Sequence, residues 1–426
     1  MKTSKFKQTE IGIIPEDWEV KILDTITERV CVGYVGTCLK DFCDENVGIP
    51  LFRTTNLTDE GLSYTDLKYV TKEFHNRNKK SQLKKGDLLI ARHGDNGKAC
   101  IFDRDIEANC LNVVIVKPNQ KLSSSKYLLY CFKSEIVKNQ VMANVGGSVQ
   151  GVVNTKIIQN LLFPYPSIQE QKAIAKILSD LDSKIEILQN QNKTLEKIGQ
   201  TIFKHWFVDF EFPNEEGKPY KYSGGEMVDS ELGEIPKGWS VEKLGDLISK
   251  NRKPIKNYED WKDKDLIDLS NMPQFSMSIT TFDKGEKFKS NIFELNEMDI
   301  LFGSIRPYFG KYGFSPIKGA ITGTVYSLKP KKEDHYAFIL NIICRREFVD
   351  YTVRLSKGTK MPIIGWNDFS DFDMVTNKEI IIKFNKVIFP SILKIKTNIL
   401  QILNLQKTRD LLLPKLMSGQ IRVNVG

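Results

Sequence analysis

The most regular pattern in the chain is an apolar spacing of four and three positions between Ser167 and Trp206. This stretch of 40 residues contains no proline and one glycine, and it is rich in Lys, Glu, Gln and Leu, which favour helix. The apolar series consists of Ile174, Leu178, Leu181, Ile185, Leu188, Leu195 and Ile202. Asn192 and Gly199 occupy the two remaining positions of that series. The spacing predicts one long helix with a coiled-coil seam, about 60 Å in length.

The residues before this helix carry a start signal. Pro164 and Pro166 precede it, and Ser167 is followed by Glu170 at the spacing of a capping box. We therefore expect the helix to begin at about residue 167.

A second helix is predicted from Asn377 to about Met417. Pro390 lies inside it and is expected to bend it. Its apolar stripe consists of Ile388, Ile392, Ile395, Ile399, Ile402, Leu405 and Leu412.

Two long helices with apolar seams must bury them, and each helix is the nearest partner for the other. Antiparallel pairing would relate the two halves of the chain by an approximate twofold axis, with globular domains at opposite ends of a rod. The alternative is that each helix is an ordinary amphipathic helix packed onto its own domain.

The chain also contains an internal duplication. Thr9–Val20 (TEIGIIPEDWEV) aligns with Ser230–Val241 (SELGEIPKGWSV), with six identical residues. Gly86–Lys98 resembles Met298–Lys311, because each has an apolar strand opened by Asp and a Gly-Lys turn behind it. The Gly-rich turns at 147–150 and 358–361 also correspond, while the segments between these landmarks diverge. The order of the repeats indicates a duplicated domain pair.

Together these patterns predict an α+β chain with two α/β globular domains in a pseudo-twofold arrangement, joined by two long antiparallel coiled-coil helices. The expected boundaries are a first domain at 1–166, a first helix at 167–208 and a linker at 209–229. A second domain follows at 230–376, and a second helix with its tail at 377–426.

Composition narrows the class of protein. Over 426 residues, 41% are hydrophobic, and no uncharged apolar run approaches the ~20 residues of a membrane-spanning helix. The polar N-terminus predicts a cytoplasmic protein without membrane contact, in which the seven cysteines are free thiols. The net charge of +9 is concentrated in residues 377–426, which carry nine basic and two acidic side chains.

No catalytic or metal motif stands out in the chain. The turn at 94–98 has the wrong spacing for a P-loop, and H-E-x-x-H and G-x-S-x-G are absent. The nearest approach to the NPPY turn of an amino-methyltransferase is NMPQF at 271–275. The cysteines also lack the paired spacing of zinc ligands. We therefore expect a binding function, with no metal and no catalytic residue in this chain.

Candidate nucleic-acid contacts occur in both halves, because Arg, Lys and Asn suit base edges and phosphates, and loop glycines let the backbone approach DNA. A basic run at 72–85 includes Lys79 and Lys80. The loop after the first Asp-led strand holds Arg92, His93, Asn96 and Lys98. Its counterpart holds Arg306, Tyr308 and Lys311, and the Gly-rich turns add Ser148, Gln150, Thr359 and Lys360.

With these features together, nearly the whole chain resembles the specificity subunit of a type I restriction-modification system. The resemblance rests on the two openings of ELGEIPKGW type, the Asp-led strands, the GGSVQG segment and the helix entry FPYPSIQEQKAIAKIL. The connector from Phe210 to Trp239 adds to it.

The resemblance implies that two target-recognition domains each read half of a bipartite site on double-stranded DNA. The two conserved helices would space those domains, and each end would recruit one of two methyltransferase subunits, with restriction subunits joining the assembly. Adenine methylation and cleavage, with S-adenosylmethionine, ATP and magnesium, would then belong to the partners. Because the middles of the two copies diverge, we expect an asymmetric target.

Two other functions are compatible with the residues. One is a single-chain DNA-modifying enzyme with an unrecognised active site. The other is a coiled-coil scaffold whose globular domains bind proteins.

Overall fold

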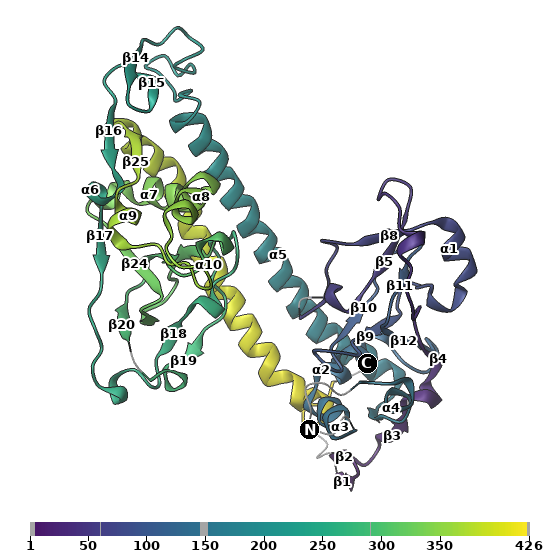
Figure 1. Cartoon of the computed structure of the whole chain (residues 1–426). Helices are drawn as coiled ribbons and strands as arrows, with labels where there is room; N and C mark the ends of the chain where they lie inside the picture. Colours follow the sequence, from purple (N-terminus) through teal and green to yellow (C-terminus); the bar gives the residue numbers. More distant parts are fainter. Residues whose placement is uncertain (1–4, 60, 145–151, 290, 424–426) are drawn as a thin grey trace. The chain divides into compact units, whose positions relative to one another are not determined.

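The computed structural model describes residues 5–59, 61–144, 152–289 and 291–423 (Figure 1). The chain forms two compact units. The first contains residues 1–183 and 406–426, and the second contains residues 184–405. Among the described helices, none is long and apolar enough to cross a membrane.

The first unit is built on two small sheets (Figure 1). One is antiparallel, in the order β10 (Ala99–Ile101), β9 (Leu88–Ile90), β12 (Val114–Pro118) and β4 (Thr27–Val32). The other has the order β11 (Asn109–Cys110), β5 (Ile49–Phe52) and β8 (Lys68–Val70), with β11 and β5 parallel. Three short pairs complete it: β1 (Phe6–Thr9) with β2 (Gly12–Pro15), β3 (Glu19–Ile22) with β13 (Leu162–Tyr165), and β6 (Leu57–Thr58) with β7 (Gly61–Leu62). The short helices are α1 (Lys72–Arg77), α2 (Ser125–Lys133), α3 (Glu135–Asn144) and α4 (Thr155–Gln159).

Strand periodicity explains how this unit is layered. Leu88 and Ile90 pack with the apolar side chains of α2 and α3, whereas Leu89 packs with Phe52 of the other sheet. Since successive strand side chains point to opposite faces, the apolar run of β9 is buried on both sides.

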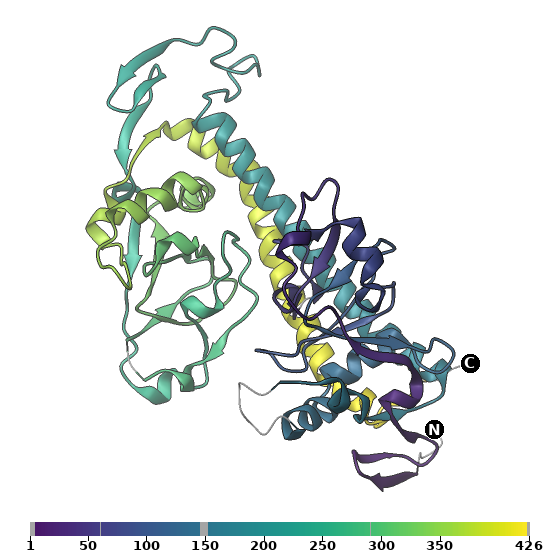
Figure 2. The same ribbon diagram turned by 45° about the vertical axis from the view of Figure 1, so that its right-hand side comes forward.

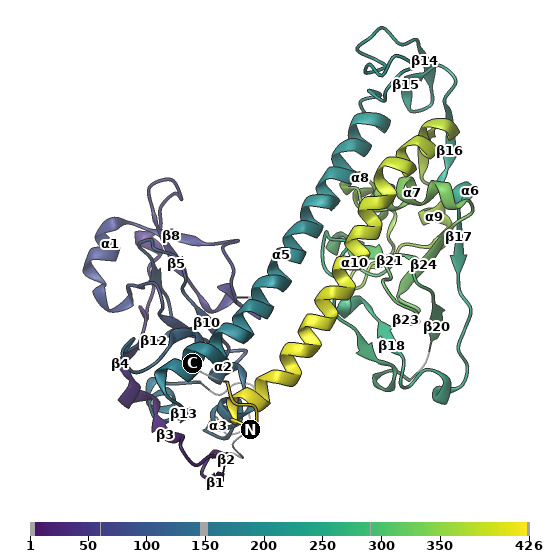
Figure 3. The same ribbon diagram turned by 180° about the vertical axis from the view of Figure 1, so that it is seen from behind.

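The second unit repeats this plan with different residues (Figure 3). One sheet has the order β17 (Ile248–Asn251), β24 (Val325–Pro330), β21 (Ile300–Gly303) and β22 (Tyr312–Phe314). The other has the order β19 (Asp283–Lys284), β18 (Asp265–Ile267), β23 (Gly319–Thr322) and β20 (Ile292–Leu295). The pairs β14 (Met227–Ser230) with β15 (Gly233–Pro236) and β16 (Ser240–Lys243) with β25 (Asp373–Thr376) match those of the first unit. The short helices are α6 (Leu244–Leu247), α7 (Tyr336–Ile343), α8 (Arg346–Leu355) and α9 (Trp366–Ser370).

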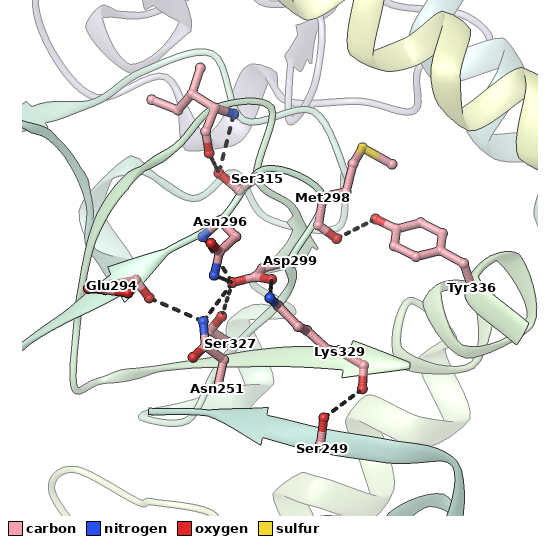
Figure 4. A network of polar contacts seen from close by, with 11 residues as sticks. Ser249, Asn251, Glu294, Asn296, Met298, Asp299, Ser315, Ser327, Lys329 and Tyr336 are labelled. Atoms are coloured by element: carbon pink, nitrogen blue, oxygen red, sulfur yellow. Dashed lines mark hydrogen bonds and ion pairs between the residues drawn. The ribbon is translucent and has the colours of Figure 1, made fainter. Parts of the chain in front are cut away.

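The Asp that opens one strand in each unit is a buried anchor. Asp299, 1% exposed, accepts hydrogen bonds from Asn251 Nδ2 at 3.0 Å and Ser327 Oγ at 2.8 Å (Figure 4). Asp87 accepts from Lys117 Nζ at 2.7 Å and from the backbone N–H of Lys84 at 2.8 Å. A buried carboxylate requires such partners, so each Asp fixes the start of its strand against the neighbouring strand.

The two predicted long helices are present. The first, α5, is Ile168–Phe207, and the second, α10, is Lys378–Met417. Both bounds fall within one residue or so of the expected ones, and the prediction of two long helices is confirmed. The α10 helix continues through Pro390 without a break, and the bend expected there stays a prediction, as do the domain boundaries and the pseudo-twofold arrangement.

Within the second unit the helices run antiparallel and in contact, as Figure 2 shows for their paired segments. The rings of Phe203 and Phe384 lie 5.7 Å apart, and Asn398 Nδ2 donates to Asn192 Oδ1 at 2.8 Å. Most of the expected seam residues are buried, and the half-buried ones are Leu181, Leu195, Ile202, Leu405 and Leu412.

Gly199 has a packing reason to interrupt the seam. A methyl group there would approach Oδ1 of Asn341, on α7, to 3.3 Å. The glycine therefore lets α7 lie close against α5, where a larger residue would separate them.

In the first unit, the start of α5 packs against the end of α10. Ile174 and Leu178 share a core with Leu416 and Met417. Arg409 Nη1 donates to Asp182 Oδ1 at 2.9 Å. Beyond the helix, Arg422 pairs with both Asp17 and Glu170.

The helix entry differs in part from a capping box. Ser167 Oγ accepts from the backbone N–H of Glu170 at 3.3 Å, as expected of the cap. The Glu170 carboxylate instead accepts from Trp18 Nε1 at 3.2 Å and from Arg422. The repeated Trp of the chain opening therefore ties that segment to the start of α5.

The Asn192–Asn398 contact gives a stability prediction. Asn192→Leu should lower the free energy of unfolding by about 1–3 kcal/mol, because it leaves the buried Asn398 amide without that partner. Asn192→Leu with Asn398→Leu should recover most of the loss, since two leucines suit the apolar seam. Urea unfolding in a double-mutant cycle measures the coupling.

Asn190→Leu, at an exposed position of the same helix, is the control and should stay within about 0.5 kcal/mol of the wild type. An additive cycle would contradict a specific amide contact in the seam.

Candidate nucleic-acid interface

Three loops meet at one edge of the first unit. Because β5 and β11 are parallel, Arg53 and Asn112, which follow their strands, lie at the same edge. Arg92 follows β9, which pairs antiparallel with β12 just beyond Asn112. The Arg92 guanidinium joins two of these loops, because its Nη1 donates to Asn112 Oδ1 at 2.6 Å. Its Nε donates to the Val153 carbonyl at 3.3 Å.

The other predicted residues of this loop have different surroundings. Lys98 Nζ forms ion pairs with Asp59 at 2.9 Å and Asp95 at 2.6 Å, so its charge is compensated within the unit. His93 is exposed, and Asn96 is half-buried with a contact inside the chain. Ser148 and Gln150 lie outside the described residues.

The predicted basic run forms a supported turn. Lys79 and Lys80 are exposed on a 3₁₀ turn, Lys79–Ser81. Beneath it, buried Asn109 donates to Ser81 Oγ at 2.7 Å, and its Oδ1 lies 2.5 Å from His75 Nδ1.

Exposed Lys84 and Lys85 follow, and within the described ranges none of the four lysines has an ion-pair partner. An uncompensated cationic turn on a rigid base suits phosphate contacts.

In the second unit, the corresponding edge is held together by hydroxyl groups. Asp268 follows β18, which is parallel to β23. Thr322 Oγ1 and Thr324 Oγ1 donate to Asp268 Oδ1 at 2.6 and 3.1 Å. Thr324 also accepts, at its carbonyl, the backbone N–H of Ser304 at 2.9 Å.

The Arg306 loop and the Gly-rich turn at 358–361, which were predicted separately, lie together at this edge. Arg306 has left-handed backbone angles (φ 50°, ψ 57°), and its N–H donates to the Pro362 carbonyl at 2.7 Å. Its Nη2 donates to the Lys360 carbonyl at 3.4 Å. Tyr308, Thr359 and Lys360 are exposed on these loops. Lys311 instead makes a contact within the unit, because its Nζ donates to the Leu269 carbonyl.

A buried carboxylate on α5 supports this edge. Glu196 accepts from Ser276 Oγ at 3.2 Å and from Ser278 Oγ at 2.9 Å. Burial raises the pKa of the Glu196 carboxyl, against the hydrogen bonds that lower it. The loop that carries the two serines is itself bonded to the loop that carries Arg306, because the Phe275 N–H donates to the Gly310 carbonyl at 2.8 Å. Glu196 therefore connects the long helix to the loop that carries Arg306.

Sequence reasoning missed Arg53, Asp268 and Glu196. A signal for the first two exists, because F-R-T-T-N-L at 52–57 aligns with I-D-L-S-N-M at 267–272. Glu196 gave none, since a Glu beside a coiled-coil seam is an ordinary surface residue. Among the described residues, no group of three or more His, Cys, Asp and Glu side chains is placed to hold a metal ion.

Comparisons with known proteins agree on one family. Residues 15–197 match the family model of the type I restriction modification DNA specificity domain. The type I restriction enzyme MjaIX specificity subunit of Methanocaldococcus jannaschii is 29% identical, with 99% of this chain and 97% of that protein aligned. The HindI specificity subunit of Haemophilus influenzae is 24% identical over 80% of this chain and 88% of its own length.

A solved structure supports the fold. The crystal structure of the type I restriction-modification S subunit from M. genitalium aligns over 100% of both chains, with a TM-score of 0.56 and 15% identity. At that identity the likeness shows the architecture, and the duplicated α/β units with long helices are confirmed.

The contacts of the predicted cationic residues distinguish a side chain that holds loops together, Arg92, from exposed side chains that have no such structural role, Lys79 and Lys80. Arg92→Ala should lower the free energy of unfolding by about 1–3 kcal/mol, because it removes charged hydrogen bonds to Asn112 and Val153. Lys79→Ala with Lys80→Ala should change it by less than about 0.5 kcal/mol per residue, as exposed side chains do. Urea unfolding of the full chain measures both, and an unchanged Arg92→Ala variant would show that its contacts do not hold the loops.

Proposed function

We propose that this chain reads an asymmetric, bipartite DNA target for a type I restriction-modification system. The reason is that it belongs to the family of specificity subunits of such systems. Each unit would read one half of the target. The observation that supports this is the repeated edge of strand ends, which has the same backbone plan in both units and different side chains in each.

The differences between the two edges favour unlike half-sites. The first unit presents Arg53 and Arg92 with Asn112. The second presents Asp268 with threonine hydroxyls, and Arg306 beside them. Donor and acceptor patterns in the major groove distinguish all four base pairs, so edges that differ in donors and acceptors select different sequences.

The chemistry of modification would lie in partner subunits. We expect two methyltransferase subunits that use S-adenosylmethionine, and restriction subunits that use ATP and magnesium, to assemble on this chain. The role of this chain would be non-catalytic. Since its binding target would be cellular DNA, we expect it to act in the cytoplasm.

The first test is the methylated sequence itself. Cells that express the chain with its cognate methyltransferase subunit should carry methylated adenines in a bipartite motif whose halves differ. Single-molecule sequencing of their DNA identifies it, and cells with the methyltransferase alone are the control. A palindromic motif would contradict unlike half-sites, and the same motif in the control would contradict a specificity role.

The basic turn predicts a separate effect on affinity. In the assembled complex, Lys79→Ala with Lys80→Ala should weaken binding to every DNA sequence and reduce the slope of log K against log salt by about 0.9 per lost phosphate contact. Lys237→Ala, whose ammonium is paired with Glu226, is the matched control. Fluorescence anisotropy over a salt series measures the slope, and an altered methylation motif would instead make these lysines base contacts.

A further inference from the structure

The repeated edge contains one turn that is the same in both units. Arg53 begins a 3₁₀ turn, Thr54–Asn56, and its backbone N–H donates to Asn56 Oδ1 at 3.0 Å. Asp268 begins the turn Leu269–Asn271, and its N–H donates to Asn271 Oδ1 at 2.9 Å. The same cap holds the same backbone after equivalent strands, so the two side chains leave the chain at equivalent positions with opposite charges.

Arg53 is held without being neutralised. Its Nη2 donates to the Asp66 carbonyl at 2.9 Å, and its Nε is buried without an acceptor among the described residues. No carboxylate within the described ranges pairs with it. One side of the guanidinium is therefore tethered to the backbone, while the side chain remains half-buried with donors to spare.

Asp268 is held in a complementary way. Its Oδ1 accepts from Thr322 and Thr324, and no Lys or Arg in the described part of the chain forms an ion pair with it. A carboxylate is repelled by phosphate, so an unneutralised Asp on a DNA-facing edge is unsuited to backbone contacts. It suits an amino group on a base edge, and the exocyclic amine of cytosine is the usual partner of Asp.

We propose that Arg53 and Asp268 are equivalent base-reading positions, at which Arg53 donates to O6 and N7 of a guanine and Asp268 accepts from N4 of a cytosine. The proposal rests on the proposed DNA-reading function. The same backbone turn would thus select a different base in each unit, because it carries Arg53 in one and Asp268 in the other.

The test uses conservative variants of the full chain with its cognate methyltransferase, read out by sequencing of methylated adenines. Arg53→Lys keeps the charge and loses the planar fork, so it should relax one guanine position by roughly tenfold and leave the other half-site intact. Asp268→Asn keeps the shape and should relax one cytosine position in the other half-site, with adenine admitted there.

Matched controls lie in the same units. Arg77→Lys changes an exposed arginine that pairs with Asp41, and Asp265→Asn changes the other end of β18. Both should leave the motif unchanged. Arg53→Gln is the second variant of the first position, and it should shift the preference there from guanine toward adenine.

The outcomes separate the two hypotheses. A wild-type chain without a bipartite motif would contradict the proposed function itself. With that motif present, an unchanged motif in Arg53→Lys and Arg53→Gln, or a uniform loss of methylation at all sites, would make Arg53 a phosphate or folding residue. A variant pair that altered the same half-site would likewise overturn the equivalence of the two positions.

Discussion

The rest of each unit depends on one carboxylate that has been taken out of water. Burying an unpaired charge costs far more than a single contact can return, so Asp299 is tolerable only with its hydrogen bonds complete. Asn251 and Ser327, from the adjoining strands β17 and β24, supply two of them, and the backbone N–H of Asn296 supplies another, as Figure 4 shows. Lys329 Nζ adds an ion pair at 3.8 Å. The start of β21 is therefore fixed against β24 and, through it, β17, and the position of the loop at the other end of β21 follows. Asp87 and Lys117 repeat this constraint in the first unit.

The long helices also support the loop beside Arg306. Their seams bury leucine and isoleucine, which stabilises without specifying one register, and the buried Asn192–Asn398 contact adds a preference for one alignment. Glu196 then extends from α5 to Ser276 and Ser278. Since a buried carboxylate must keep its donors, a shift of the helix would disturb the loop beside Arg306. The helix is thus a structural support of the second edge as well as a packing partner.

How much could be predicted from the sequence follows from the range of each interaction. The long helices were predictable because seven apolar residues repeat the same local spacing, and the Asp-led strands because the motif occurs twice. Arg92 and Lys98 were correctly placed in one loop, but their partners Asn112 and Asp59 are distant in sequence and gave no local signal. Arg53 and Asp268 were missed because their opposite charges conceal an equivalence that shows weakly in the alignment of 52–57 with 267–272 and clearly in the shared Asn cap.

Net charge was a poor guide to the edge for a physical reason. Phosphate contacts need uncompensated cations, and Lys79 and Lys80 provide them on a turn where no carboxylate of the described residues pairs with either ammonium. Base contacts need fixed donors and acceptors of either sign. An edge built from tethered Arg53 in one unit and from Asp268 with its threonines in the other contributes almost nothing to the charge of +9. Under the proposed function, affinity and sequence selection would therefore be carried by different side chains, and a change in one need not disturb the other.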